Sequence, residues 1–141
     1  MGNVLTFYLN GGLFGIDIKL VKEIDRNVDY TPIPDAKPYI VGLINLRGQI
    51  VTLLNLERLM GREYRNREQK VTCIILKNQS DDAGQLGILI DKSGDVIDIP
   101  EGDCEELPAN MGDIEGEYIN GVVKLRNELL MLLNVQKIFD N

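Results

Sequence analysis

The sequence carries one long segment twice. Residues 39–62 align with residues 118–141 at a constant offset of 79, without a gap, and eight of the 24 aligned pairs are identical. Two β-hairpins rich in Leu and Ile can look alike by chance, but an ungapped register over this length favours a true repeat. We therefore predict that residues 1–141 form one domain built from two copies of a small β unit, with approximate repeats over 1–62 and 70–141.

The apolar runs have the length and composition of strands. Residues 4–9 and 13–18 flank Asn10-Gly11-Gly12, which predicts a β-hairpin. The stretch Tyr39–Leu56 is β-branched and interrupted at Arg47-Gly48, so it predicts two strands joined by a tight turn. Many short strands with turn signals indicate small barrels rather than one open sheet. Further strands are expected at residues 28–31, 71–77, 86–90 and 96–100.

A weaker repeat supports the duplication without assigning the strands. Phe14–Ile18 resembles Leu86–Ile90, and each segment follows an apolar strand and a polar loop. The repeat does not fix which strands belong to which lobe, because strands can be exchanged between two copies.

Helical signals are short. Asn55 and Asn134 each precede a brief amphipathic turn, and Asn is a good N-cap, so short helices are predicted after residues 55 and 134. Apolar residues at 20, 21 and 24 predict one further helical turn over 20–24. The remaining segments are predicted to be a charged linker at 62–70, a polar loop at 78–85 and a long acidic loop at 101–117.

The composition excludes several classes of site. The chain has no His, which excludes Ser-His-Asp and Cys-His catalysis, His-ligated zinc and the usual proton shuttle near neutral pH. The two cysteines, Cys73 and Cys104, form neither a CxxC motif nor a disulfide framework. Cys73 lies in an apolar run and is predicted to be a small core residue. We expect no catalytic residue, metal or cofactor.

Charge and hydropathy also limit the partners. The net charge is −7, and residues 78–117 hold twelve acidic residues against the single base Lys92. This balance disfavours nucleic-acid binding, which needs clustered Lys and Arg. No segment has the pattern of a signal peptide or of a membrane-spanning helix, so we expect a cytoplasmic protein without direct membrane insertion.

Several short motifs spread over the chain together form a specific pattern. They are Phe14-Gly15-Ile16-Asp17-Ile18, Val21 with Glu23-Ile24, Pro34, and Gly42 followed by Asn45-Leu46-Arg47-Gly48. In this arrangement they resemble the CheW family of chemotaxis coupling proteins over nearly the whole chain. The resemblance implies a mainly β fold of two intimately packed five-stranded SH3-like barrels. It also implies a non-enzymatic adaptor that couples the cytoplasmic tips of chemoreceptors to the regulatory domain of the histidine kinase CheA, in cytoplasmic arrays at the inner face of the membrane.

The same resemblance implies a partner-binding site. Arg47 at the tip of a tight turn has a fork of five donors that can reach a partner's carboxylate. The alternative from the residues alone is a structural pair between Arg47 and a nearby acid that holds the two units together. Gly42 and Gly48 permit close backbone approach or positive φ. The candidate partner-binding residues are Val21, Glu23, Gly42, Asn45, Arg47 and Gly48.

The sequence also departs from the family pattern. Thr52 stands where a proline is common, and Asn55 and Asn134 stand where aspartates are usual. The second copy has Arg126-Asn127 in place of Arg47-Gly48, which predicts that the two turns are not equivalent in function.

Three other functions are weighed against the motility adaptor. The first is a CheW-like scaffold in a chemosensory array that does not serve motility. The second is an oligonucleotide-binding barrel, which the acidic balance and scarce aromatics disfavour. The third is an enzyme built on acids, Lys, Ser or Tyr, for which the chain offers no motif.

Overall fold

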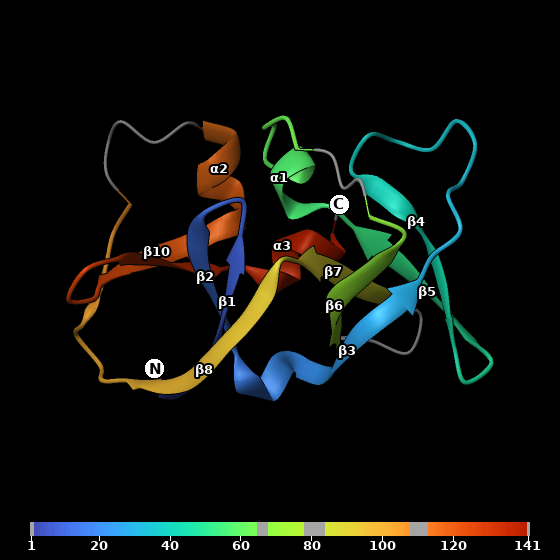
Figure 1. Ribbon diagram of the computed structural model, residues 1–141. Coiled ribbons are helices and arrows are strands. Elements are labelled where there is room, and N and C mark those ends of the chain that lie inside the picture. The colour runs from blue at the N-terminus through green and yellow to red at the C-terminus, as the bar shows by residue number, and fades with distance from the viewer. Residues whose placement is uncertain (1, 65–67, 78–83, 108–112, 141) are drawn as a thin grey trace. The chain divides into compact units, whose positions relative to one another are not determined.

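The structure is a computed structural model that describes residues 2–64, 68–77, 84–107 and 113–140. The chain divides into two compact units, each with its own β-sheet (Figure 1). Unit 1 comprises Met1–Leu20 and Lys92–Asn141, and unit 2 comprises Val21–Asp91. The prediction of a mainly β chain with two β lobes is confirmed.

The sheet of unit 1 has six strands in the order β8-β1-β2-β11-β10-β9. The sixth strand, β9, has only two residues and extends the five that the family resemblance implied. Figure 1 shows β8 running beside β1. The strands are β1 (Gly2–Leu9), β2 (Gly12–Asp17), β8 (Lys92–Ile99), β9 (Cys104–Glu105), β10 (Ile119–Lys124) and β11 (Leu129–Leu133).

The sheet of unit 2 has five strands in the order β3-β6-β7-β5-β4. A backbone bridge between Thr31 and Leu43 joins the end of β3 to β4, the two strands at opposite ends of that order. The strands are β3 (Val21–Asp29), β4 (Ile40–Leu46), β5 (Gln49–Leu54), β6 (Lys70–Leu76) and β7 (Gln85–Ile90).

The two copies of the sequence repeat exchange strands between the two sheets. The hairpin β1–β2 from the first copy pairs with β8 and β11 from the second, and β10 continues that sheet beyond β11. The strands β6 and β7 from the second copy pair with β3 and β5 from the first, and β4 continues that sheet beyond β5. Each copy therefore contributes strands to both sheets, and the aligned segments β4–β5 and β10–β11 occupy matching positions in the two strand orders.

Each sheet contains one parallel pair of strands, and a glycine lies within it. Gly15 of β2 is in register with Leu132 of β11, and Gly87 of β7 is in register with Leu53 of β5. A Cβ atom on Gly15 would lie 2.6 Å from a methyl carbon of Val4, and so could not be accommodated without movement. The Phe-Gly and Leu-Gly echo in the sequence therefore marks these close-packed parallel junctions.

The two short helices after the asparagine caps are confirmed. They are α1 (Leu56–Leu59) and α3 (Val135–Phe139). The Asn55 and Asn134 side chains accept hydrogen bonds from the backbone N–H groups of Arg58 and Lys137 at 3.2 and 3.1 Å. These bonds satisfy donors that a helix start leaves open.

The helical turn predicted over 20–24 is wrong. A 3-10 turn, η1, ends at Leu20 (Ile18–Leu20), and β3 begins at Val21. Val21 and Ile24 instead face β6 in antiparallel register with Leu76 and Ile74. Cross-strand pairing along the whole of β3 outweighs the weak helical spacing of three apolar residues.

The acidic loop predicted at 101–117 is partly regular, because it contains β9 and a helix, α2 (Asp113–Tyr118). Residues 108–112 of that loop lie outside the described residues, as do 65–67 of the predicted linker and 78–83 of the predicted polar loop.

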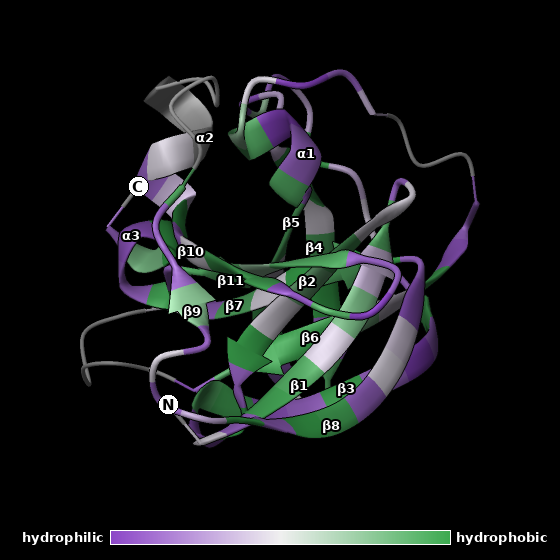
Figure 2. Cartoon of the chain, turned by 90° about the vertical axis from the view of Figure 1, so that its left-hand side faces the viewer, coloured by the Kyte–Doolittle hydropathy of each residue, from purple (hydrophilic) through white to green (hydrophobic). Residues whose placement is uncertain are grey.

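Each unit has its own apolar cluster. Figure 2 shows apolar and polar residues interleaved along the outer strand β8, which suits a strand with one buried face. Cys73 is fully buried in the cluster of unit 2, as predicted, and burial raises the pKa of its thiol to about 12. The unit 2 cluster is Ile44, Val51, Leu53, Val71, Cys73, Ile75 and Leu89, and that of unit 1 is Val4, Leu13, Ile99, Val123, Leu130 and Leu132.

Candidate partner-binding site

The β4–β5 hairpin of unit 2 ends in a two-residue turn. Leu46 pairs with Gln49, which leaves Arg47 and Gly48 as the turn itself. Both have positive φ, 51° and 85°, the pattern of a type I′ turn whose twist matches that of the strands. The Asn45 side chain braces the turn, because its Oδ1 accepts from the Gly48 N–H at 3.1 Å.

Arg47 is an unusual residue for this turn position. A left-handed backbone costs an ordinary residue roughly 1–2 kcal/mol, and Gly, Asn and Asp are the usual occupants. The hairpin β1–β2 follows the rule, with Asn10 and Gly11 at φ 51° and 82°. In the β4–β5 turn the strain is carried by an arginine whose side chain is 68% exposed.

The guanidinium of Arg47 is held by β3. Its Nη2 donates to Oε1 of Glu23, whose side chain is 26% exposed. An ion pair with so exposed a partner adds only about 0–1 kcal/mol of stability. Its main effect is to fix the direction of the arginine while most of the side chain stays exposed. The acid partner that sequence reasoning allowed for is therefore Glu23, and both residues belong to unit 2.

A second carboxyl group, that of Asp25, lies on the same strand as Glu23. Asp25 follows Glu23 by two residues on β3, and its Oδ2 is buried with no hydrogen-bond partner among the described residues. Burial raises the pKa of Asp25, and the negative charge of Glu23 raises it further, while Arg47 acts in the opposite direction. The site thus holds two neighbouring carboxyl groups and one cation.

Apolar side chains flank the turn. Ile50 is 54% exposed, and it pairs with Asn45 immediately before the turn. Val21 is half-buried at the start of β3, where a β-bulge separates it from Glu23. Bulges redirect side chains and are frequent beside functional sites. The turn therefore combines an exposed cation with an exposed apolar side chain, and Arg is enriched in protein–protein interfaces.

Gly42 has a different place. It is buried in β4 at a β-bulge, and a Cβ atom there would lie 2.4 Å from the backbone oxygen of Thr31. The aligned Gly121 of β10 also lies at a bulge, where a Cβ would meet Cys104 Sγ at 2.6 Å. The close backbone approach expected of Gly42 is therefore present, and it explains this glycine through packing. A direct contact between Gly42 and a partner stays a prediction.

The aligned turn of unit 1 is built differently. Lys124 pairs with Leu129, which leaves a four-residue connection closed by the Leu125 N–H donating to the Glu128 oxygen at 2.9 Å. Neither Arg126 nor Asn127 has a positive φ. The two turns therefore differ in structure, and the predicted difference in their function stays a prediction.

The structure brings most of the predicted residues together. Glu23, Asn45, Arg47 and Gly48 share one hydrogen-bonded group around the turn, whereas Gly42 is buried in its strand. Sequence reasoning missed Asp25 and Ile50. The alternation of Glu23 and Asp25 on one strand face would have revealed Asp25, had residues 20–24 been interpreted as a strand.

Within the described ranges, no group of three or more His, Cys, Asp or Glu residues is arranged to hold a metal ion. None of the helices described here combines the length and the apolar character that crossing a membrane requires.

The family assignment follows from comparison with known proteins. The family model described as the CheW-like domain matches residues 3–141. The chain belongs to the CheW family.

Named CheW proteins and one solved structure resemble nearly the whole chain. Chemotaxis protein CheW of Treponema pallidum is 34% identical over 98% of this chain and 82% of its own length. Chemotaxis protein CheW of Thermotoga maritima is 29% identical over 97% of this chain and 87% of its own length. The crystal structure of the scaffolding protein TtCheW from Thermoanaerobacter tengcongensis matches with a TM-score of 0.79 at 27% identity, covering 94% of this chain and 88% of that one. The protein is thus a chemotaxis scaffold of the CheW type.

Proposed function

We propose that this CheW-family protein couples the cytoplasmic tips of chemoreceptors to the regulatory domain of the histidine kinase CheA, within cytoplasmic arrays beside the membrane. The adaptor binds both partners at once, so that a change in the receptor alters kinase activity through shared contacts. This role needs no nucleophile, proton shuttle or cofactor.

The observation that carries the proposal is the strained Arg47 turn. The turn places an arginine where Asn or Gly would be less strained, and Glu23 then fixes the guanidinium with 68% of the side chain exposed. A local ion pair of this kind contributes little stability. Both the strain and the exposure are accounted for if Arg47 donates to a carboxylate of a partner protein.

The test is charge reversal at the turn. Arg47→Glu is expected to weaken binding of the kinase regulatory domain or of the receptor by about tenfold or more, because a charged hydrogen bond is replaced by repulsion. Binding is measured by co-sedimentation with each partner separately, and folding by thermal unfolding. Arg126→Glu in the aligned turn is the matched control and should bind normally.

A double variant separates the two possible roles of Arg47. Combining Arg47→Glu with Glu23→Arg exchanges the charges and restores the local pair. If the partner contacts Arg47 directly, binding stays weak in the double variant, as proposed. If binding returns to normal, the pair acts only by shaping the turn. Unchanged binding in Arg47→Glu alone would remove this residue from the interface.

A further inference from the structure

Unit 2 also carries a concave surface, which does not include the Arg47 turn. It is a groove of about 280 Å³, here called the tyrosine groove. Its apolar walls come from the end of β3, the following loop, β4 and the segment after α1. These walls are Tyr30, Pro32, Pro38, Val41 and Tyr64, and the polar groups along it are Asn55 and Arg58.

The floor of the tyrosine groove is firmly built. Tyr30, Val41 and Tyr64 pack against the buried cluster of unit 2. The hydroxyl of Tyr64 donates to Oδ1 of Asp91 at 2.6 Å, and the Tyr30 hydroxyl donates to the Glu68 carbonyl at 3.4 Å. Asn55 is 4% exposed, and its Nδ2 donates to the Tyr64 carbonyl at 2.9 Å. The walls are therefore held in place before any ligand binds.

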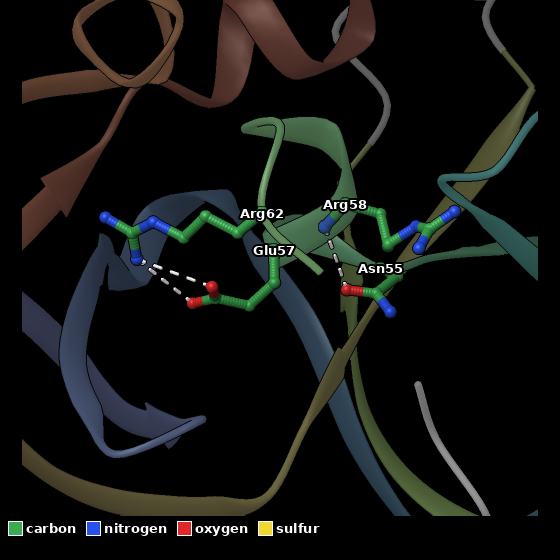
Figure 3. Close-up of polar contacts among 4 residues, drawn as sticks. All are labelled: Asn55, Glu57, Arg58 and Arg62. Atoms are coloured by element: carbon green, nitrogen blue, oxygen red, sulfur yellow. Dashed lines mark hydrogen bonds and ion pairs between the residues drawn. The ribbon is translucent and has the colours of Figure 1, made fainter. Parts of the chain in front are cut away.

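Arg58 supplies a cation that the fold does not use. Figure 3 shows its side chain directed away from the neighbouring pair of Glu57 and Arg62. That pair is closed by two contacts of 3.3 and 3.4 Å. Among the described residues Arg58 has no carboxylate partner, while its backbone N–H is taken up by the Asn55 cap. The guanidinium is thus available to an anionic group in the groove.

The charges at the two ends of Tyr64 differ in sign, so the two ends of the tyrosine groove are electrostatically different. Asp91 accepts the hydrogen bond at the hydroxyl end of Tyr64, and burial, Asp91 and Glu68 together raise the pKa of that hydroxyl to about 12. The backbone end of Tyr64 contacts Asn55, whose helix cap includes Arg58. An acidic group is therefore favoured at the Arg58 end and repelled at the Asp91 end.

We propose that the tyrosine groove binds an extended, proline-containing acidic segment of a partner protein. Tyrosine and proline walls suit the polyproline II helix, which enters aromatic-lined grooves with little loss of conformational entropy. The unpaired Arg58 selects a Glu or Asp side chain on that segment by charge complementarity. This site is independent of the Arg47 turn and of the coupling role proposed for it.

The direct test is binding of a fluorescently labelled peptide, acetyl-Pro-Pro-Glu-Pro-Pro-Glu-amide, to the full chain at low ionic strength. Saturable binding in fluorescence anisotropy is expected, with about tenfold weaker binding of the matched peptide that has Gln in place of Glu. Arg58→Gln should weaken binding of the Glu peptide to the level of the Gln peptide. Arg126→Gln, at an exposed arginine of unit 1, is the matched control and should leave both affinities unchanged.

Folding and location are checked in the same experiment. Arg58→Gln should keep the thermal midpoint of the parent chain, and amide shifts in NMR titrations should concentrate at Tyr30, Val41 and Tyr64. The proposal is overturned if no saturable binding occurs at millimolar peptide, or if the Glu and Gln peptides bind equally. It is also overturned if free glutamate binds as tightly as the peptide, or if the amide shifts lie outside the groove.

Discussion

At the residue scale, two hairpins of this protein form the same kind of two-residue turn with different residues. Asn10-Gly11 places residues with a low cost of positive φ in the β1–β2 turn. In the β4–β5 turn the first residue is Arg47, for which positive φ costs conformational energy, and the exposed ion pair with Glu23 does not offset that cost. The choice of arginine is therefore explained by what the turn presents and not by stability.

Asp25 gives the chain a pH dependence whose sign follows from its surroundings. Its pKa is raised on folding, chiefly by burial and then by Glu23, so its contribution to stability is complete below the ordinary Asp value of 3.8 and is lost as pH rises through the raised pKa. One oxygen of Asp25, Oδ2, is buried without a hydrogen-bond partner among the described residues, so a charge on it is poorly compensated. We predict that Asp25→Asn raises the free energy of unfolding at pH 7 by about 1 kcal/mol.

The measurement is urea unfolding of the parent and Asp25→Asn at pH 7 and again near pH 3.8. The advantage of the variant should shrink at the lower pH, where the parent carboxyl is protonated on folding. Asp29→Asn serves as the control, because the Asp29 side chain is 77% exposed. An equal advantage at both pH values would exclude ionisation of Asp25 as the cause.

The sequence predicted the chemistry of this site better than its geometry. The motif at 45–48 and the acid at Glu23 were identified, because turn residues and charges can be recognised locally. The Arg47–Glu23 contact depends on β3 and β4 approaching each other at opposite ends of one strand order, which no local pattern reveals. The burial of Gly42 depends in the same way on the distant Thr31 backbone.

At the element scale, the two asparagine caps provide an internal comparison. Both side chains accept a bond from the third residue beyond the cap, but within the described part of the chain only Asn55 also donates to a carbonyl, that of Tyr64. We predict that Asn134→Ala lowers the free energy of unfolding by about 1 kcal/mol and Asn55→Ala by about 2 kcal/mol.

Urea unfolding of the two alanine variants tests this difference. Asn55→Asp is the informative control, since it keeps the cap oxygen and removes the amide donor, and it should fall between the parent and Asn55→Ala. Equal losses in both alanine variants would show that the bond to Tyr64 contributes nothing.

The same scale shows where sequence periodicity fails. Residues 20–24 have helical spacing, yet Val21 begins a nine-residue strand. A short apolar run is ambiguous on its own, and pairing with β6 along its length decides the outcome. The caps at Asn55 and Asn134 were predictable because capping is a local interaction between a side chain and the next turn.

At the scale of the whole molecule, the repeat was visible in the sequence but the pairing of its strands was not. The parallel pairs β2–β11 and β5–β7 join segments that are distant in sequence and carry no mutual signal. Their existence depends on each copy contributing to both sheets, which is a property of packing and not of local pattern.

This division predicts how fragments behave. Residues 21–91 contain all five strands of their sheet and the apolar cluster of unit 2, so this fragment should unfold cooperatively, with a stability of about 3–5 kcal/mol. Residues 92–141 lack β1 and β2, so they should remain unfolded alone. Circular dichroism with urea checks both fragments.

Complementation provides the control for the fragment experiment. A peptide of residues 1–20 supplies the missing hairpin, and its addition to 92–141 should induce β-sheet signal. A folded 92–141 fragment without the peptide, or an unfolded 21–91 fragment, would contradict this division of the chain.

The parallel pair β2–β11 also determines when the sheet of unit 1 can be completed during synthesis. Unit 2 is contiguous in sequence and is complete once Asp91 has left the ribosome. The hairpin β1–β2 is made first, but β1 gains β8 only when Lys92–Ile99 emerges, and β2 gains β11 only when Leu129–Leu133 emerges. At about 5–20 residues per second, the edge of β2 therefore stays open for roughly 6–23 s. During this interval the nascent chain is most exposed to aggregation and most dependent on chaperones.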